Sequence, residues 1–198
     1  MGLPIRDQAH HTYADYRSWP EDRRYELIDG IAYLMAPAPT VAHQTIAFEI
    51  GRQAGNALDG KPCRVLVAPL DVRLPKPGQS DDETDTVVQP DVLVVCDPAR
   101  LEPRGVRGAP DWIVEVLSPA TASHDQILKR RIYEQAGVRE YWMVHPQDRV
   151  LTIYRLADGN YGVPDIGELT DETVVAAVPD VVIRWAPIVE LLGPQEPG

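Results

Sequence analysis

Two short, strongly apolar segments that each carry one carboxylate constrain the fold of this chain more than any other feature. The first is Gln89-Pro-Asp-Val-Leu-Val-Val-Cys96 and the second is Asp111-Trp-Ile-Val-Glu-Val-Leu-Ser118. Apolar runs of this length are typical of strands that are buried on both faces of a sheet. Because side chains alternate along a strand, Asp91 and Glu115 each share a face with apolar residues of their own strand.

A carboxylate buried in an apolar strand is costly unless it is protonated, paired or bound to a cation. If the two predicted strands are neighbours, Asp91 and Glu115 could bind a hard divalent ion such as Mg²⁺ through oxygen ligands. The alternative is that each carboxylate lies at a strand end and meets an arginine or water. The spacing of the residues leaves both interpretations open.

The segment after the second strand is predicted to form a helix that carries a third charge. Ser123 and Gln126 have capping-box spacing, and Gly137 stands where a left-handed C-terminal cap belongs. With a helical period of about 3.6 residues, Lys129 falls on the apolar stripe of this helix, which is unusual for a lysine. Lys129 either pairs with Asp125 and extends to solvent, or directs its ammonium group at the two carboxylates and orients a nucleophilic water.

The other predicted elements set the fold class. Asp29-Gly30 predicts a hairpin over 25–35, and Thr40 is a suitable cap for a helix that ends near Leu58. The remaining predicted strands are short apolar runs bounded by turn residues, at 64–74, 87–96, 112–118, 141–144 and 150–156. A short strand and one helical turn are expected in the tail. Many strands with two main helices indicate an α+β or mixed α/β domain without regular βαβ alternation.

Two further polar residues are candidates for the same site. His43 falls on the apolar stripe of the first predicted helix, within its first turn. A lone histidine in such a place is more often a core residue than a catalyst. Glu26 points opposite to its neighbours in the hairpin, and a single glutamate on a strand is a weak signal. Either residue is a candidate to complete the site.

Length, charge and cysteine content limit the possible classes of protein. At 198 residues the chain fits a single domain. Thirty acidic and nineteen basic residues give a net charge of −11, which repels nucleic acid at long range, although part of the surplus lies in an acidic loop at 80–85 that is predicted to be solvated. Cys63 and Cys96 are too few for a disulfide scaffold. With no apolar run long enough for a membrane span and no signal segment, we expect a cytoplasmic protein with reduced thiols and no membrane partner.

Taken together, the motifs resemble a known family. They are, in chain order, 25–30, His43, 88–95, 110–119 and 137–142. In order and spacing they are similar to the Uma-two family of restriction endonucleases, within the PD-(D/E)XK nuclease superfamily, over about 13–192. The resemblance implies one restriction-endonuclease-like domain over 1–198. Its mixed central sheet would be flanked by two main helices, with an added N-terminal hairpin and C-terminal strands.

The resemblance also implies an activity, which is Mg²⁺- or Mn²⁺-dependent hydrolysis of DNA phosphodiester bonds by a homodimer. Pro90-Asp91 matches the Pro-Asp of the superfamily and Glu115 matches its second acid, so both are expected to bind the metal, with the carbonyl of Val116 as a further ligand. Glu26 or His43 would complete the catalytic site.

One position departs from the superfamily pattern, because Leu117 stands where a lysine is usual. We interpret Lys129 as the residue that replaces this missing lysine, since it comes from the following helix and points inward. The missing lysine and the acidic charge leave an alternative open, a non-catalytic binding module that keeps only the fold. Hydrolysis of RNA or of another phosphoester is also left open by the residues.

Overall fold

The computed structural model describes residues 9–20, 24–35, 39–118 and 125–195. The helices are α1 (Tyr13–Tyr16), α2 (Val41–Ala57), the 3₁₀ turn η1 (Pro98–Arg100), the π-helical turn η2 (Asp125–Lys129), α4 (Arg130–Ala136) and α5 (Ala186–Leu192). The strands before residue 110 are β1 (Tyr25–Ile28), β2 (Ile31–Leu34), β3 (Arg64–Val67), β4 (Val72–Arg73), β5 (Val87–Val88), β6 (Val92–Val95), β7 (Leu101–Glu102) and β8 (Gly105–Arg107). The later strands are β9 (Trp112–Val116), β10 (Glu140–His145), β11 (Val150–Ala157), β12 (Asn160–Tyr161), β13 (Asp165–Glu168), β14 (Glu172–Val174) and β15 (Val182–Arg184).

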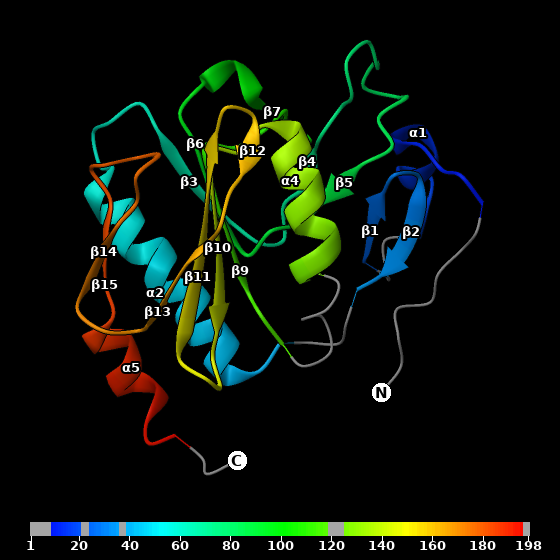
Figure 1. Ribbon diagram of the computed structural model, residues 1–198. Helices are drawn as coiled ribbons and strands as arrows, with labels where there is room; N and C mark the ends of the chain where they lie inside the picture. Colours follow the sequence, from blue (N-terminus) through cyan, green and yellow to red (C-terminus); the bar gives the residue numbers. More distant parts are fainter. Residues whose placement is uncertain (1–8, 21–23, 36–38, 119–124, 196–198) are drawn as a thin grey trace.

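The central sheet is mixed and lies between two layers of helix. Its strand order is β12-β11-β10-β9-β6-β3, and β13 also pairs with β11. Strands β9 and β10 run parallel, whereas β6 is antiparallel to both β9 and β3. Helices α2 and α5 lie on one side of this sheet and α4 on the other (Figure 1). The α+β class and the two flanking helices predicted from the sequence are confirmed.

Side chains of the central strands alternate between two hydrophobic cores. On β9, Trp112, Val114 and Val116 enter the core beneath α2, which contains Ile46 and Ile50. Their neighbours Ile113 and Leu117 enter the core beneath α4, which contains Ile132 and Tyr133. Glu115 lies between Ile113 and Leu117 in this alternation and is therefore directed to the α4 side of the sheet.

A second sheet lies beside α4, with strand order β2-β1-β5-β4-β8-β7. It changes two of the predictions. The strands expected over 64–74 and 87–96 are each divided, so that β3 and β6 join the central sheet while β4 and β5 join the second one. Pro69 and Pro90 lie at the two divisions, and a proline has no N–H group to continue a strand ladder. The prediction of one long strand over 64–74 and another over 87–96 is therefore wrong.

The predicted turns and caps agree with the structure wherever it describes them. Asp29 and Gly30 both have positive φ at the turn between β1 and β2, as a tight hairpin requires. The Thr40 hydroxyl accepts a hydrogen bond from the His43 N–H at the start of α2. Gly137 ends α4 with a φ of 87°. The capping box proposed for Ser123 and Gln126 lies outside the described residues and side chains.

Cys63 and Cys96 form a disulfide bond, so the expectation of reduced thiols is wrong for this structure. The cause is strand register. Arg64 of β3 is paired with Val95 of β6, and the same antiparallel register places the two cysteines opposite each other one step further on. This pairing depends on which strands are neighbours, and the positions of two cysteines in a sequence do not reveal it.

Candidate active site

A buried lysine and a buried glutamate form the centre of the candidate site. Lys129 is the last residue of the π-helical turn η2, and Glu115 lies on β9. The ammonium Nζ of Lys129 lies 3.0 Å from Oε1 of Glu115, and the two residues are only 3% and 4% exposed. Lys129 therefore points inward and does not extend to solvent. The side chain of Asp125, its alternative partner, lies outside the part of the chain whose side chains are described.

Glu26 contacts the same lysine from the second sheet. Its Oε1 lies 2.9 Å from Lys129 Nζ and also accepts a hydrogen bond of 2.9 Å from the backbone N–H of Gln89. Glu26 lies on β1 and is 4% exposed. The lysine thus joins the two sheets, with one carboxylate from each. Such a buried cluster is tolerated because each charge has a partner.

Tyr133, one helical turn beyond Lys129, supports Glu115 from α4. Its hydroxyl donates a hydrogen bond of 2.6 Å to Oε1 of Glu115. Burial, and then the charge of Glu115, raise the pKa of the Tyr133 phenol well above its usual value. The phenol therefore stays protonated and acts as a donor at neutral pH.

Asp91 lies at the end of β6, immediately before the first strand residue, Val92. Val92 is paired with Val114 across the antiparallel ladder, so the same register places Asp91 opposite Glu115. The Asp91 carboxylate accepts a hydrogen bond of 2.8 Å from the Val116 N–H through Oδ2. The Pro-Asp motif and the second acid are therefore neighbours, which the assumption of adjacent strands required.

His43 contacts Asp91 from the α2 side of the central sheet, opposite the side on which α4 lies. Its Nε2 lies 3.2 Å from Asp91 Oδ2, and its side chain is 12% exposed. The Nδ1 atom is buried and has no hydrogen-bond partner among the described residues. His43 thus contacts Asp91, whereas Glu26 contacts Lys129, so the predicted candidates lie in two contact groups linked by β6 and β9.

The donor set fits a magnesium ion better than a transition metal. In the described ranges 9–20, 24–35, 39–118 and 125–195, no three His, Cys, Asp or Glu side chains are grouped so that they could hold a metal. Mg²⁺ does not need such a group, because it usually keeps several waters and binds one or two carboxylates together with substrate phosphate oxygens. Asp91 and Glu115, at paired positions, would be the two carboxylates of such a site, and the Val116 carbonyl lies next to Glu115 in the chain.

Two supporting residues were missed from the sequence. Tyr133 could have been predicted from helical spacing, because it follows Lys129 by one helical turn and so extends toward the same strand. No sequence pattern predicts the role of Gln89, since its contact with Glu26 depends on the second sheet. Leu117 is 5% exposed in the core beneath α4, so the position that usually bears lysine is purely apolar here.

The comparison with family models decides the family. The model of the Uma2 family, described as "Putative restriction endonuclease", matches residues 13–186, which is most of the chain. The chain belongs to the Uma2 family. The recognition made from the sequence motifs is thereby confirmed. This Uma2 chain is also 28% identical over 179 residues to the "Uncharacterized protein slr1290" of Synechocystis sp., covering 86% of this chain and 90% of that protein.

A solved structure supports the fold of this Uma2 member. It is the crystal structure of "a putative nuclease belonging to DUF820" from Anabaena variabilis, with a TM-score of 0.70 and 19% sequence identity. The match covers 91% of this chain and 98% of that one. The two chains thus share their fold at low sequence identity. Within the described residues, no helix is both long enough and apolar enough to cross a membrane.

Proposed function

We propose that this Uma2 protein is a Mg²⁺-dependent endonuclease that hydrolyses phosphodiester bonds of DNA. The proposal rests on two observations, the buried Lys129–Glu115 ion pair and the strand register that places Asp91 opposite Glu115. Among the reactions that an acid pair and a cation can catalyse, membership of the Uma2 family supports phosphodiester hydrolysis.

Asp91 and Glu115 would hold the metal ion, with the Val116 carbonyl beside them. A bound Mg²⁺ polarises a phosphoryl oxygen and lowers the pKa of a bound water. The contacts described above suggest how the carboxylates are oriented. The Val116 N–H and His43 fix the Asp91 carboxylate, and Tyr133 fixes that of Glu115. A fixed carboxylate needs little reorganisation during the reaction, which favours catalysis.

Lys129 would orient the attacking water and stabilise the charge that develops on the phosphate. In the superfamily pattern this cation comes from two residues after the second acid, where this chain has Leu117. Here the helix after the strand delivers it, and its Nζ lies within 3.0 Å of Glu115. Glu26 would hold the ammonium group in place through its 2.9 Å contact, so its role is positioning.

Plasmid cleavage tests the proposal. Wild-type protein with Mg²⁺ or Mn²⁺ is expected to nick or cut supercoiled DNA, and no cleavage is expected in EDTA. Asp91→Asn should remove the activity. The matched control is Asp111→Asn at the other end of β9, where the aspartate accepts from the Cys96 N–H and pairs with Arg139. This control should cleave like the wild type.

Equal cleavage by wild type and Asp91→Asn would contradict the assignment. Binding of DNA by the wild type without cleavage, over both metals and several substrates, would favour the non-catalytic module instead. The homodimer and the cytoplasmic location remain predictions from the resemblance and from the sequence.

A further inference from the structure

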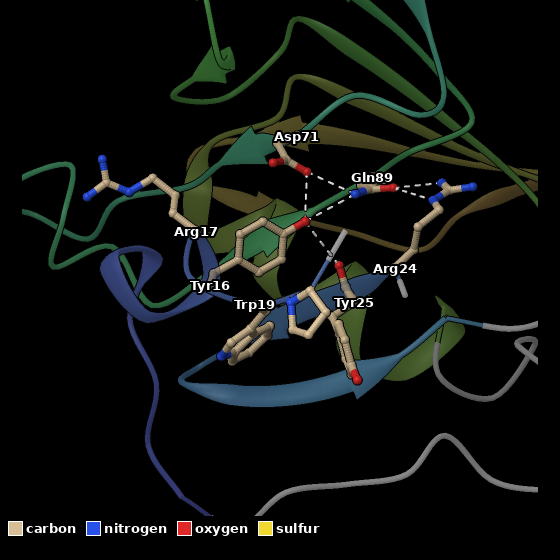
Figure 2. A pocket seen from close by; sticks show the side chains of 8 residues that line it. Tyr16, Arg17, Trp19, Arg24, Tyr25, Asp71 and Gln89 are labelled. Carbon is tan, nitrogen blue, oxygen red and sulfur yellow. Dashed lines mark hydrogen bonds between the residues drawn. The ribbon is translucent and has the colours of Figure 1, made fainter. Parts of the chain in front are cut away.

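An aromatic pocket lies next to the candidate active site and has no part in the chemistry described so far. It has a volume of about 320 Å³. Its lining comes from the end of α1 and the segment after it, the start of β1 and the residues that flank β4 and β5: Tyr16, Arg17, Trp19, Pro20, Arg24, Tyr25, Asp71 and Gln89 (Figure 2). We propose that this pocket binds an unpaired nucleobase of the DNA strand. The inference rests on the proposed function and names the form of DNA that the site takes.

The pocket offers flat apolar surfaces. Trp19 packs against two tyrosine rings, with ring centroids 5.4 Å from Tyr16 and 5.1 Å from Tyr25. Trp19 and Tyr25 are only partly exposed, so their faces are held by packing and do not move freely. Every nucleobase has a π-face that can stack on such rings, so this contact does not depend on the DNA sequence.

The opposite wall of the pocket is polar and fixed. The Gln89 side chain accepts from both Nε and Nη2 of Arg24, at 3.0 and 2.6 Å. It donates to the Tyr16 hydroxyl and to Oδ1 of Asp71. The hydroxyl of Tyr16 donates to the same Asp71 oxygen, which leaves Asp71 Oδ2 outside both of these hydrogen bonds. A carboxylate oxygen in such a wall can accept from the amino edge of a base.

Two arginines at the pocket supply charge for a phosphate. Arg17 and Arg24 are positive groups on a protein whose net charge is −11. Arg17 pairs with Asp82, but the side chains are 34% and 63% exposed, and exposed pairs of this kind contribute little. A phosphate group can therefore compete for Arg17. Rings and guanidinium groups together match a nucleotide better than an uncharged ligand.

The position of the pocket links it to the candidate active site. Tyr25 lines the pocket and the next residue, Glu26, binds Lys129. Gln89 lines the pocket through its side chain, donates to Glu26 through its backbone, and precedes the Pro90-Asp91 motif. A base held in the pocket would thus belong to a nucleotide close to the scissile phosphate. A base can enter only when it is unpaired, so single-stranded DNA should bind better than duplex DNA.

The test measures binding to fluorescein-labelled single-stranded and duplex oligonucleotides of one sequence, in EDTA, by anisotropy. The wild type should prefer the single strand. Trp19→Ala should weaken single-strand binding about tenfold, as expected for the loss of one stacked base, and leave duplex binding unchanged. Phe48→Ala, which removes a 63% exposed ring on α2 outside the pocket, is the matched control and should change neither. Equal single-strand binding by wild type and Trp19→Ala would overturn the inference.

A second variant guards against a folding defect in Trp19→Ala. Trp112, Trp142 and Trp185 are 0% exposed, so Trp19 is the tryptophan that bound DNA can quench. Trp19→Phe keeps a ring for stacking. It should bind the single strand within a few-fold of wild type and lose the fluorescence change on binding. A fluorescence change that persists in Trp19→Phe would place the DNA elsewhere.

The two proposals fail separately, because binding is measured without metal and cleavage with it. A wild type that binds single strands through Trp19 but never cleaves would overturn the proposed function alone. A wild type that cleaves in a metal-dependent way, with unchanged single-strand binding in Trp19→Ala, would overturn the pocket alone.

Discussion

Lys129 and Glu115 form a buried ion pair, with Nζ 3.0 Å from Oε1 and both side chains no more than 5% exposed. The pair connects the turn before α4 to the central strand β9, and Glu26 extends it to the second sheet. A cluster of this kind is sensitive to the loss of one member, because the remaining charges cannot reach water. The cluster is therefore both the candidate catalytic centre and a structural junction.

Replacing the lysine should destabilise the protein strongly. Lys129→Met keeps a similar length but leaves Glu26 and Glu115 without their cation, and breaking a buried pair in this way costs about 3–5 kcal/mol. Urea denaturation monitored by circular dichroism measures the loss. The control is Lys61→Met, because Lys61 pairs with Asp180 at the surface, where side chains are 38% and 61% exposed and the cost should be below about 1 kcal/mol. Similar losses for both variants would show that the Lys129 cluster is not strongly coupled.

Reduction of the disulfide should lower stability without changing the fold. The bond between Cys63 and Cys96 spans a sequence separation of 33, and closing a loop of that length stabilises by about 3–4 kcal/mol in the chain-entropy account. Urea midpoints with and without reductant measure the effect, and Cys63→Ser/Cys96→Ser should be insensitive to reductant. Two titratable thiols in native protein that was purified without reductant would contradict the bond.

Glu140 should make stability decrease as pH rises. Burial raises the pKa of this carboxyl above its ordinary value of 4.5, against the lowering effect of a hydrogen bond from Trp142. Above pH 4.5 the unfolded chain releases this proton before the folded chain does, so rising pH favours unfolding through this group until the folded pKa is passed. The free energy of unfolding of Glu140→Gln, relative to wild type, should therefore increase as pH rises. Urea titrations over a pH series measure the difference, and a decrease with rising pH would have the wrong sign.

Much of the fold was predictable because its signals are local. The Asp29-Gly30 turn, the Thr40 cap and the Gly137 cap each depend on neighbours in the chain, and each occurs as expected. Helical periodicity likewise placed Lys129 on the apolar stripe of its helix, although it left open whether the ammonium group points inward or extends to solvent. The division of two predicted strands between two sheets did not follow, because it depends on which strands become neighbours.

The parts of the site that could not be predicted are contacts between distant segments. Glu26 reaches Lys129 only because β1 and β5 pair in a second sheet, and the hairpin alone does not reveal that pairing. The acidic loop at 80–85 is a similar case. It was expected to be solvated, yet Asp81 pairs with the fully buried Arg73, and Asp85, only 5% exposed, pairs with Lys76.

The role of Glu115 in catalysis is tested most directly by the single-turnover rate of DNA cleavage by wild type, Glu115→Gln and Glu140→Gln in Mg²⁺. Both substitutions keep the size of a buried glutamate and remove its charge, but only Glu115 belongs to the proposed centre. Loss of a residue that only orients a metal ligand typically lowers activity by about 10- to 100-fold. Loss of the ligand itself should therefore lower the rate by roughly 100-fold or more. We expect that loss for Glu115→Gln, with Glu140→Gln close to wild type. Cleavage by Glu115→Gln at the wild-type rate would contradict this role.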